Sequence, residues 1–102
     1  MFKVENDVLD LRFNRQKMKT LESMYNISLM AELTKNRGML SLHLMEGLFS
    51  VGLYNTSEEK TVKGQKALDI FESLIEENGY VNLNNIIIGK LEEDLAFLFH
   101  NA

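Results

Sequence analysis

Residues 41–53 constrain the fold of this chain more than any other segment, because they combine strong hydrophobicity with the spacing of an α-helix. The apolar face of the predicted helix consists of Leu44, Met45, Leu48, Phe49 and Gly52, with Leu42, Val51 and Leu53 beside it. Residues three and four positions apart share one face of a helix. Ser41 precedes the run, and serine is a preferred N-cap residue. We therefore expect a central core helix that begins after Ser41.

Two glycines lie inside this predicted helix, Gly47 and Gly52. Glycine in a helix interior is destabilising by about 1 kcal/mol relative to alanine. We therefore expect another part of the backbone to approach the helix closely at these two positions.

Residues 2–13 are predicted to form a β-hairpin. Leu9, Leu11 and Phe13 alternate with Val8, Asp10 and Arg12, which is the period-two pattern of a half-buried strand. A second short run, residues 2–5, is separated from it by Asn6-Asp7, and both residue types are common in tight turns. Because an isolated hairpin is marginally stable in water, we expect it to pack on helices.

The rest of the chain, residues 15–100, is predicted to be helical. Asn14 can cap a first helix that carries Met18, Leu21 and Tyr25 on one face and ends near Asn26. Ser28 can cap a shorter second helix, residues 29–33, that ends before Gly38.

A fourth helix is predicted to begin near Thr56, because Thr56 and Glu59 have the spacing of a capping box. Its apolar positions are Ala67, Leu68, Phe71, Leu74 and Ile75, and Gly79 is suited to the position just past its end. Residues 61–65 are poor in apolar side chains, so the first turns can fray or form a loop.

A last helix is predicted to be capped within residues 82–85, with Leu83, Ile87, Leu91, Leu95 and Leu98 on one line. The β-branched run Ile86-Ile87-Ile88 is also compatible with a short strand. We favour the helix because the helical spacing continues to Leu98. The predicted fold class is thus mainly α (α+β), with a short N-terminal β-hairpin followed by a bundle of four to five helices.

Composition excludes several classes of site. A chain of 102 residues predicts a single domain, 1–102, and the absence of cysteine excludes disulfides, thiolate metal sites and cysteine nucleophiles. The two histidines, His43 and His100, lie in no metal-binding or catalytic motif, so we expect no enzyme, no metal and no cofactor.

The charged N-terminus lacks the apolar run of a signal peptide, and no stretch has the length of a membrane span. We expect a cytoplasmic protein without a membrane partner.

The net charge of −4 is distributed unevenly. Residues 1–66 hold ten Lys or Arg and eight Asp or Glu, a net +2, whereas residues 67–102 hold one Lys and seven Asp or Glu, a net −6. The acidic C-terminal part opposes nucleic-acid binding. The basic residues near the N-terminus form either a solvated mixed face or a surface for an acidic partner, including another copy of the chain.

Five residues are candidates for partner binding: Phe97, Leu98, Phe99, Met18 and Met24. Residues 95–99 are apolar on more than one helical face, so an aromatic side chain is either exposed to a partner or packed back on the hairpin. The methionines are either core residues that fill gaps or part of an adaptable binding surface.

The order of features over residues 2–53 resembles a known family. The resemblance is carried by the N-terminal strand pair, Leu21-Glu22, Ile27-Ser28-Leu29 and the run from Leu40 to Leu53. Small tail assembly chaperones of long-tailed phages and of prophages of Gram-positive bacteria often have an LE…G.SL segment followed by an LS…L..LL.AGL helix. This chain has Asn26-Ile27 where members often have glycine, and residues 67–100 are compatible with the family without being diagnostic.

The resemblance implies a non-catalytic tail assembly chaperone. Its partners would be the tape measure protein and tail tube subunits, and the chain would self-associate as a homo-oligomer. An alternative from another class is a small helical regulator or nucleic-acid-binding adaptor that uses the basic residues Arg12, Arg15, Lys17 and Lys19.

Overall fold

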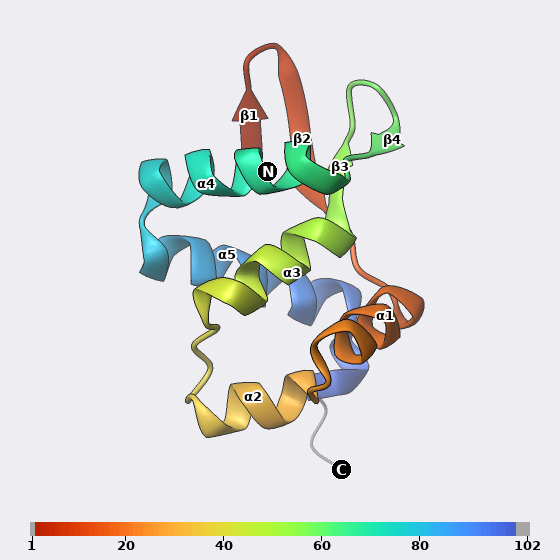
Figure 1. Cartoon of the computed structure of the whole chain (residues 1–102), viewed down its shortest axis with the longest axis vertical. Coiled ribbons are helices and arrows are strands. Elements are labelled where there is room, and N and C mark those ends of the chain that lie inside the picture. Colours follow the sequence, from red (N-terminus) through yellow and green to blue (C-terminus); the bar gives the residue numbers. More distant parts are fainter. Residues whose placement is uncertain (1, 100–102) are drawn as a thin grey trace.

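The computed structural model describes residues 2–99 (Figure 1). Over these residues the fold is mainly α, with five α-helices and a short four-stranded antiparallel sheet in the order β1-β2-β3-β4. The sheet and α4 lie at one end of the molecule and α2 lies at the other, with α3 between them (Figure 1). This arrangement agrees with the predicted fold class.

The predicted N-terminal hairpin is present, as β1 (Phe2–Val4) and β2 (Asp7–Leu11). Its turn consists of Glu5 and Asn6, because Val4 pairs with Asp7 in the ladder. The predicted turn at Asn6-Asp7 was therefore wrong by one residue. Glu5 takes the left-handed backbone conformation, with φ of 57°, and thereby closes the tight turn.

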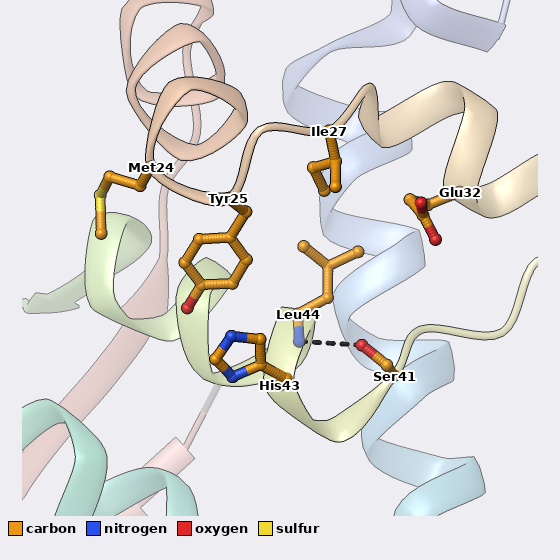
Figure 2. A pocket seen from close by; sticks show the side chains of 7 residues that line it. All are labelled: Met24, Tyr25, Ile27, Glu32, Ser41, His43 and Leu44. Atoms are coloured by element: carbon orange, nitrogen blue, oxygen red, sulfur yellow. Dashed lines mark hydrogen bonds between the residues drawn. The ribbon is translucent and has the colours of Figure 1, made fainter.

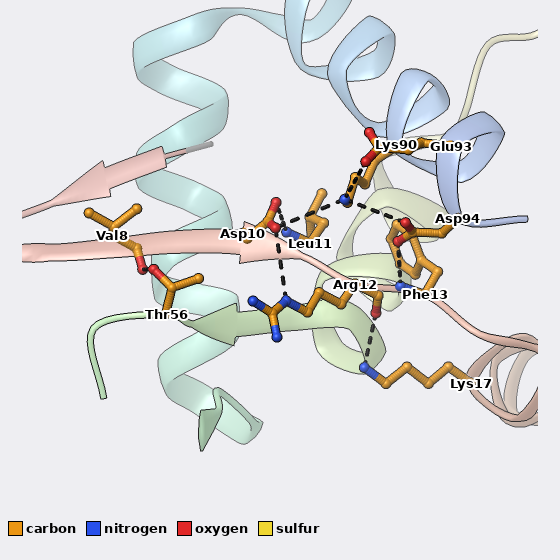
Figure 3. A network of polar contacts seen from close by, with 10 residues as sticks. All are labelled: Val8, Asp10, Leu11, Arg12, Phe13, Lys17, Thr56, Lys90, Glu93 and Asp94. Atoms are coloured by element: carbon orange, nitrogen blue, oxygen red, sulfur yellow. Dashed lines mark hydrogen bonds and ion pairs between the residues drawn. The ribbon is translucent and has the colours of Figure 1, made fainter. Parts of the chain in front are cut away.

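A second pair of strands was not predicted. The chain leaves α3 directly into β3 (Leu53–Asn55), which pairs with β2, and then forms β4 (Lys60–Thr61). The Thr56 hydroxyl, expected to cap a helix, instead donates a hydrogen bond of 2.8 Å to the carbonyl of Val8 (Figure 3). The prediction of a helix beginning at Thr56 is wrong, because pairing with β2 supplies hydrogen bonds that the local sequence does not reveal.

The first three helices begin where the sequence indicates, and the second runs to residue 35, two residues beyond the predicted 29–33. They are α1 (Arg15–Tyr25), α2 (Leu29–Lys35) and α3 (Leu42–Gly52). The side chains of Asn14, Ser28 and Ser41 each accept a hydrogen bond from a backbone N–H of the first turn. Asn26 ends α1 in the left-handed conformation, as expected of a helix stop.

Helix α3 lies at the centre of the core, as predicted. Met45, Leu48 and Phe49 have no exposed surface, and the Phe49 ring packs on Phe71 of α4 with the ring centroids 5.4 Å apart. The glycines of α3 face aromatic side chains and not a neighbouring backbone, which corrects the expectation for Gly47 and Gly52. A Cβ at Gly47 would lie 2.7 Å from the Tyr25 ring, and one at Gly52 would overlap the Phe13 ring.

Two long helices follow, α4 (Gly64–Asn78) and α5 (Tyr80–Asp94), joined by Gly79. Gly79 has φ of 82°, a conformation that glycine adopts without strain. Residues 86–88 are helical, so the strand alternative is excluded, but α5 begins at Tyr80, before the predicted caps at 82–85. The helix ends at Asp94 and a short 3-10 helix, η1 (Ala96–Phe99), follows, so the predicted regular helix through Leu98 is also corrected.

The predicted helical range extended to residue 100, and His100 lies outside the described residues. No helix between residues 2 and 99 has both the length and the apolar character needed to cross a bilayer.

Candidate partner-binding groove

A mostly apolar groove of about 200 Å³ lies between α1 and the C-terminal segment η1. Its apolar lining comes from Met18, Leu29, Phe97 and Leu98, and its polar rim from Arg15, Lys19 and Glu22. The rim residues lie on one line of α1, because they are spaced by four and three positions. The groove thus joins the beginning of the helical region to the end of the described chain. We call it the α1–η1 groove.

The aromatic side chain of this groove is Phe97, which is 47% exposed. The buried Leu95 anchors the chain just before it, and the N–H of Leu98 donates back to the carbonyl of Leu95 at 2.9 Å. This tight turn leaves Phe97 at the surface beside α1. The Arg15 guanidinium lies over the Phe97 ring, 4.6 Å from its centroid, a cation–π contact that holds the ring at the rim.

The charged side chains on the rim differ in whether they have a polar partner among the described residues. Within residues 2–99 neither Arg15 nor Lys19 takes part in an ion pair. Glu22, by contrast, is engaged, because its carboxylate accepts the N–H of Leu29 at 2.7 Å. That contact also fixes the first turn of α2 to α1. The Arg15 and Lys19 end of the groove therefore carries a local positive charge.

A polar network holds the end of α5 against the beginning of the helical region (Figure 3). The Asp94 carboxylate accepts the backbone N–H of Phe13 at 2.9 Å and lies 3.4 Å from the Lys90 ammonium. Lys90 also lies 3.9 Å from Asp10 and 3.4 Å from Glu93. Burial acts to lower the pKa of Lys90, but the surrounding carboxylates outweigh it and the pKa is raised. The network fixes the position from which η1 departs.

Two further basic residues near the N-terminus are engaged within the chain. The Lys17 ammonium donates to the carbonyl of Arg12 at 2.9 Å, and the Arg12 guanidinium lies 3.9 Å from the centroid of the Tyr54 ring. Burial, followed by the nearby charge of Arg12, lowers the pKa of Lys17. Both side chains thus have partners within the chain, although the Arg12 side chain stays about half exposed.

A second pocket, of about 350 Å³, lies between α1, α2 and α3 (Figure 2). Its lining residues are Met24, Tyr25, Ile27, Glu32, Ser41, His43 and Leu44. The Tyr25 and His43 rings are stacked, with centroids 4.7 Å apart, and burial raises the pKa of Tyr25. The Nδ1 atom of His43 lies 3.8 Å from a carboxylate oxygen of Glu46, and the His43 side chain is largely exposed.

Three of the five candidate residues, Met18, Phe97 and Leu98, line the α1–η1 groove although they are remote in sequence. Met18 is itself only 7% exposed, so it belongs to the core as much as to the groove. Phe99 is half-buried and packs against the core. Met24 lies apart, in the second pocket, and is 60% exposed.

Sequence reasoning missed the rim residues and Leu29 as parts of this groove. A signal was present, since Arg15, Lys19 and Glu22 share the helical face of Met18. What the sequence lacked was the position of Phe97 opposite that face.

Within residues 2–99, no three His, Asp or Glu side chains gather in a way that could hold a metal ion. The chain matches no protein-family model, no curated protein and no solved structure.

Proposed function

We propose that this protein is a non-catalytic tail assembly chaperone of a phage or prophage, which binds the tape measure protein and tail tube subunits during assembly of the tail. The proposal joins the resemblance of residues 2–53 to an observation on the fold. That observation is the α1–η1 groove, where an apolar floor and a half-exposed phenylalanine meet the solvent. Exposed apolar surface of this kind is typical of protein-binding sites.

The fold supports binding more than chemistry. Six large apolar side chains are at least 36% exposed among residues 2–99, namely Met24, Leu42, Tyr80, Val81, Ile86 and Phe97. Association with a partner would bury such side chains, and burial of apolar surface contributes about 25 cal/mol per Å². A chain that keeps a long helical partner soluble needs apolar surface of this kind and no reactive side chain.

The experiment is co-expression with the tape measure protein, the large helix-rich product of the gene downstream in a tail gene cluster. An affinity tag on this chain should retain the tape measure protein through purification. The control is a variant with the groove blocked, Leu98→Glu, whose fold is checked by circular dichroism. Absence of the tape measure protein from the eluate of the folded wild-type chain would contradict the proposal.

The alternative is a nucleic-acid-binding adaptor, and one observation favours it. Burial lowers the pKa of Lys17 most, and the charges of Arg12 and Lys63 lower it further against the opposing charge of Asp94, so these cations repel one another. An anionic backbone would relieve their repulsion. The discriminating measurement is a DNA mobility shift over a range of salt concentrations. A shift that weakens steeply with salt, together with no capture of the tape measure protein, would favour this alternative.

A further inference from the structure

We infer that the occupant of the α1–η1 groove is an amphipathic helix with carboxylates beside its apolar stripe, and that Lys19 and Arg15 select it by charge. This inference rests on the proposed function, because it specifies the chemistry of the partner segment bound. The occupant is a segment of another protein, and its acidic flank lies against the α1 end of the groove.

The shape of the groove favours a helix as occupant. Its apolar floor runs between helix α1 and the turn that presents Phe97 and Leu98. Helices dock in such grooves through side chains at spacings of three and four residues. The Phe97 ring supplies an aromatic contact at the edge, where an apolar residue of the partner can cover its exposed part.

The charge of the groove favours an acidic flank. Lys19 and Arg15, two basic side chains, take part in no ion pair among residues 2–99. The only rim carboxylate, that of Glu22, already accepts the N–H of Leu29, and it lies at the other end of the rim line. Carboxylates of a bound helix would therefore pair with Lys19 and Arg15, whereas a basic flank would be repelled.

A protein partner fits better than a nucleic acid. The groove floor is apolar, and a face of the Phe97 ring is already covered by the Arg15 guanidinium, which leaves less of the ring for base stacking. The C-terminal part of the chain is also acidic, with a net charge of −6 over residues 67–102. A long polyanion would meet repulsion there, whereas a short acidic helix would not.

The test uses the full chain and two synthetic peptides of about 20 residues, the length of about five and a half helical turns. Both peptides carry the same leucine stripe, flanked by glutamate in one and by lysine in the other. We expect the glutamate peptide to bind about tenfold or more tightly than the lysine peptide, with affinity falling as salt is added. Amide chemical shifts should change along α1 and η1.

The matched variants are Lys19→Glu and Lys66→Glu, each a charge reversal of an exposed lysine, with Lys66 on α4 away from the groove. Lys19→Glu should reduce binding of the glutamate peptide by about tenfold, and Lys66→Glu should leave it within about twofold. Equal effects of the two variants, equal binding of the two peptides, or displacement of the peptide by duplex DNA would each overturn the inference.

The inference and the proposed function fail in different ways. If the tape measure protein is captured by wild type and equally by Lys19→Glu and Phe97→Ser, the proposed function stands and the groove assignment is wrong. If the glutamate peptide binds the groove as described but the tape measure protein is not captured, the groove assignment stands and the proposed function is wrong.

Discussion

The side chain of Asn84, on α5, accepts a hydrogen bond of 2.8 Å from the backbone N–H of Leu40, 44 residues earlier in the chain. The same amide donates to the carbonyl of Gly38 at 3.1 Å. Asn84 is only 2% exposed, and both backbone groups belong to the connection between α2 and α3. Tyr80, one turn earlier on α5, donates its hydroxyl to the carbonyl of Leu40. Helix α5 thus fixes the loop that precedes the core helix.

Asn84→Ala should destabilise the protein by about 1–3 kcal/mol, because it leaves the buried N–H of Leu40 and the carbonyl of Gly38 without their partner. Urea denaturation measures this loss of unfolding free energy. The control is Asn85→Ala at the adjacent exposed position, which should change stability by less than about 0.5 kcal/mol. Similar values for the two variants would show that the loop does not depend on Asn84.

Gly47→Ala should destabilise the protein by about 1–3 kcal/mol, because the added methyl group overlaps the Tyr25 ring and the buried Leu21. Gly89→Ala provides the matched control, since nothing lies within 4 Å of a Cβ there. That second change should stabilise α5 by about 0.5–1 kcal/mol through helix propensity. Thermal unfolding of the two variants should therefore shift in opposite directions, and two shifts of the same sign would contradict the packing described for Gly47.

Because Lys90 forms ion pairs, we expect the protein to lose their stabilising contribution at alkaline pH. Burial opposes its charge, but Asp10, Asp94 and Glu93 raise its pKa in the folded state above the ordinary value of 10.5. A group with a raised folded-state pKa stabilises the fold below its unfolded pKa, and this contribution is lost as pH rises through the folded-state value. The stability difference between wild type and Lys90→Met should thus be constant from about pH 6 to about pH 10 and shrink as pH rises from there through the raised pKa.

The control for Lys90 is Lys66→Met, which removes an exposed lysine without an ion pair among the described residues. Its stability difference from wild type should be small at every pH. Tyr25 also has a raised pKa, but it is present in all three proteins and cancels in the comparison. A Lys90→Met difference that stays constant to pH 12 would contradict the ion-pair account.

Phe97→Ser should weaken partner binding while it lowers stability by about 1 kcal/mol or less, because nearly half of the side chain is exposed before the change. Phe99→Ser should cost more stability, since Phe99 packs against the core. Only the first variant therefore separates binding from folding. Denaturation and binding are measured on the same samples, and a Phe97 variant that keeps wild-type affinity would remove this side chain from the interface.

The elements that the sequence predicted are those with local determinants. Asn14, Ser28 and Ser41 cap their helices through hydrogen bonds within four residues, so each cap is visible in a short window of sequence. The hairpin of residues 2–11 is equally local, because its strands are joined by two residues.

The elements that were missed depend on distant residues. Strand β3 exists because Leu53 and Asn55 pair with Leu11 and Leu9, more than 40 positions away in the sequence. Asn84 resembled a helix cap in sequence, and only the fold places it beside Leu40. The α1–η1 groove likewise requires Phe97 to meet α1, a contact that no local pattern encodes.

If this chain binds and protects a helical partner, as we propose, it should raise the amount of soluble tape measure protein. That protein is expressed alone, with the wild-type chain, and with Phe97→Ser, and the soluble fraction is measured after centrifugation. We expect the tape measure protein to be mostly insoluble alone, soluble with the wild-type chain, and only partly soluble with the variant. A soluble fraction that the folded wild-type chain does not change would contradict the proposed chaperone function.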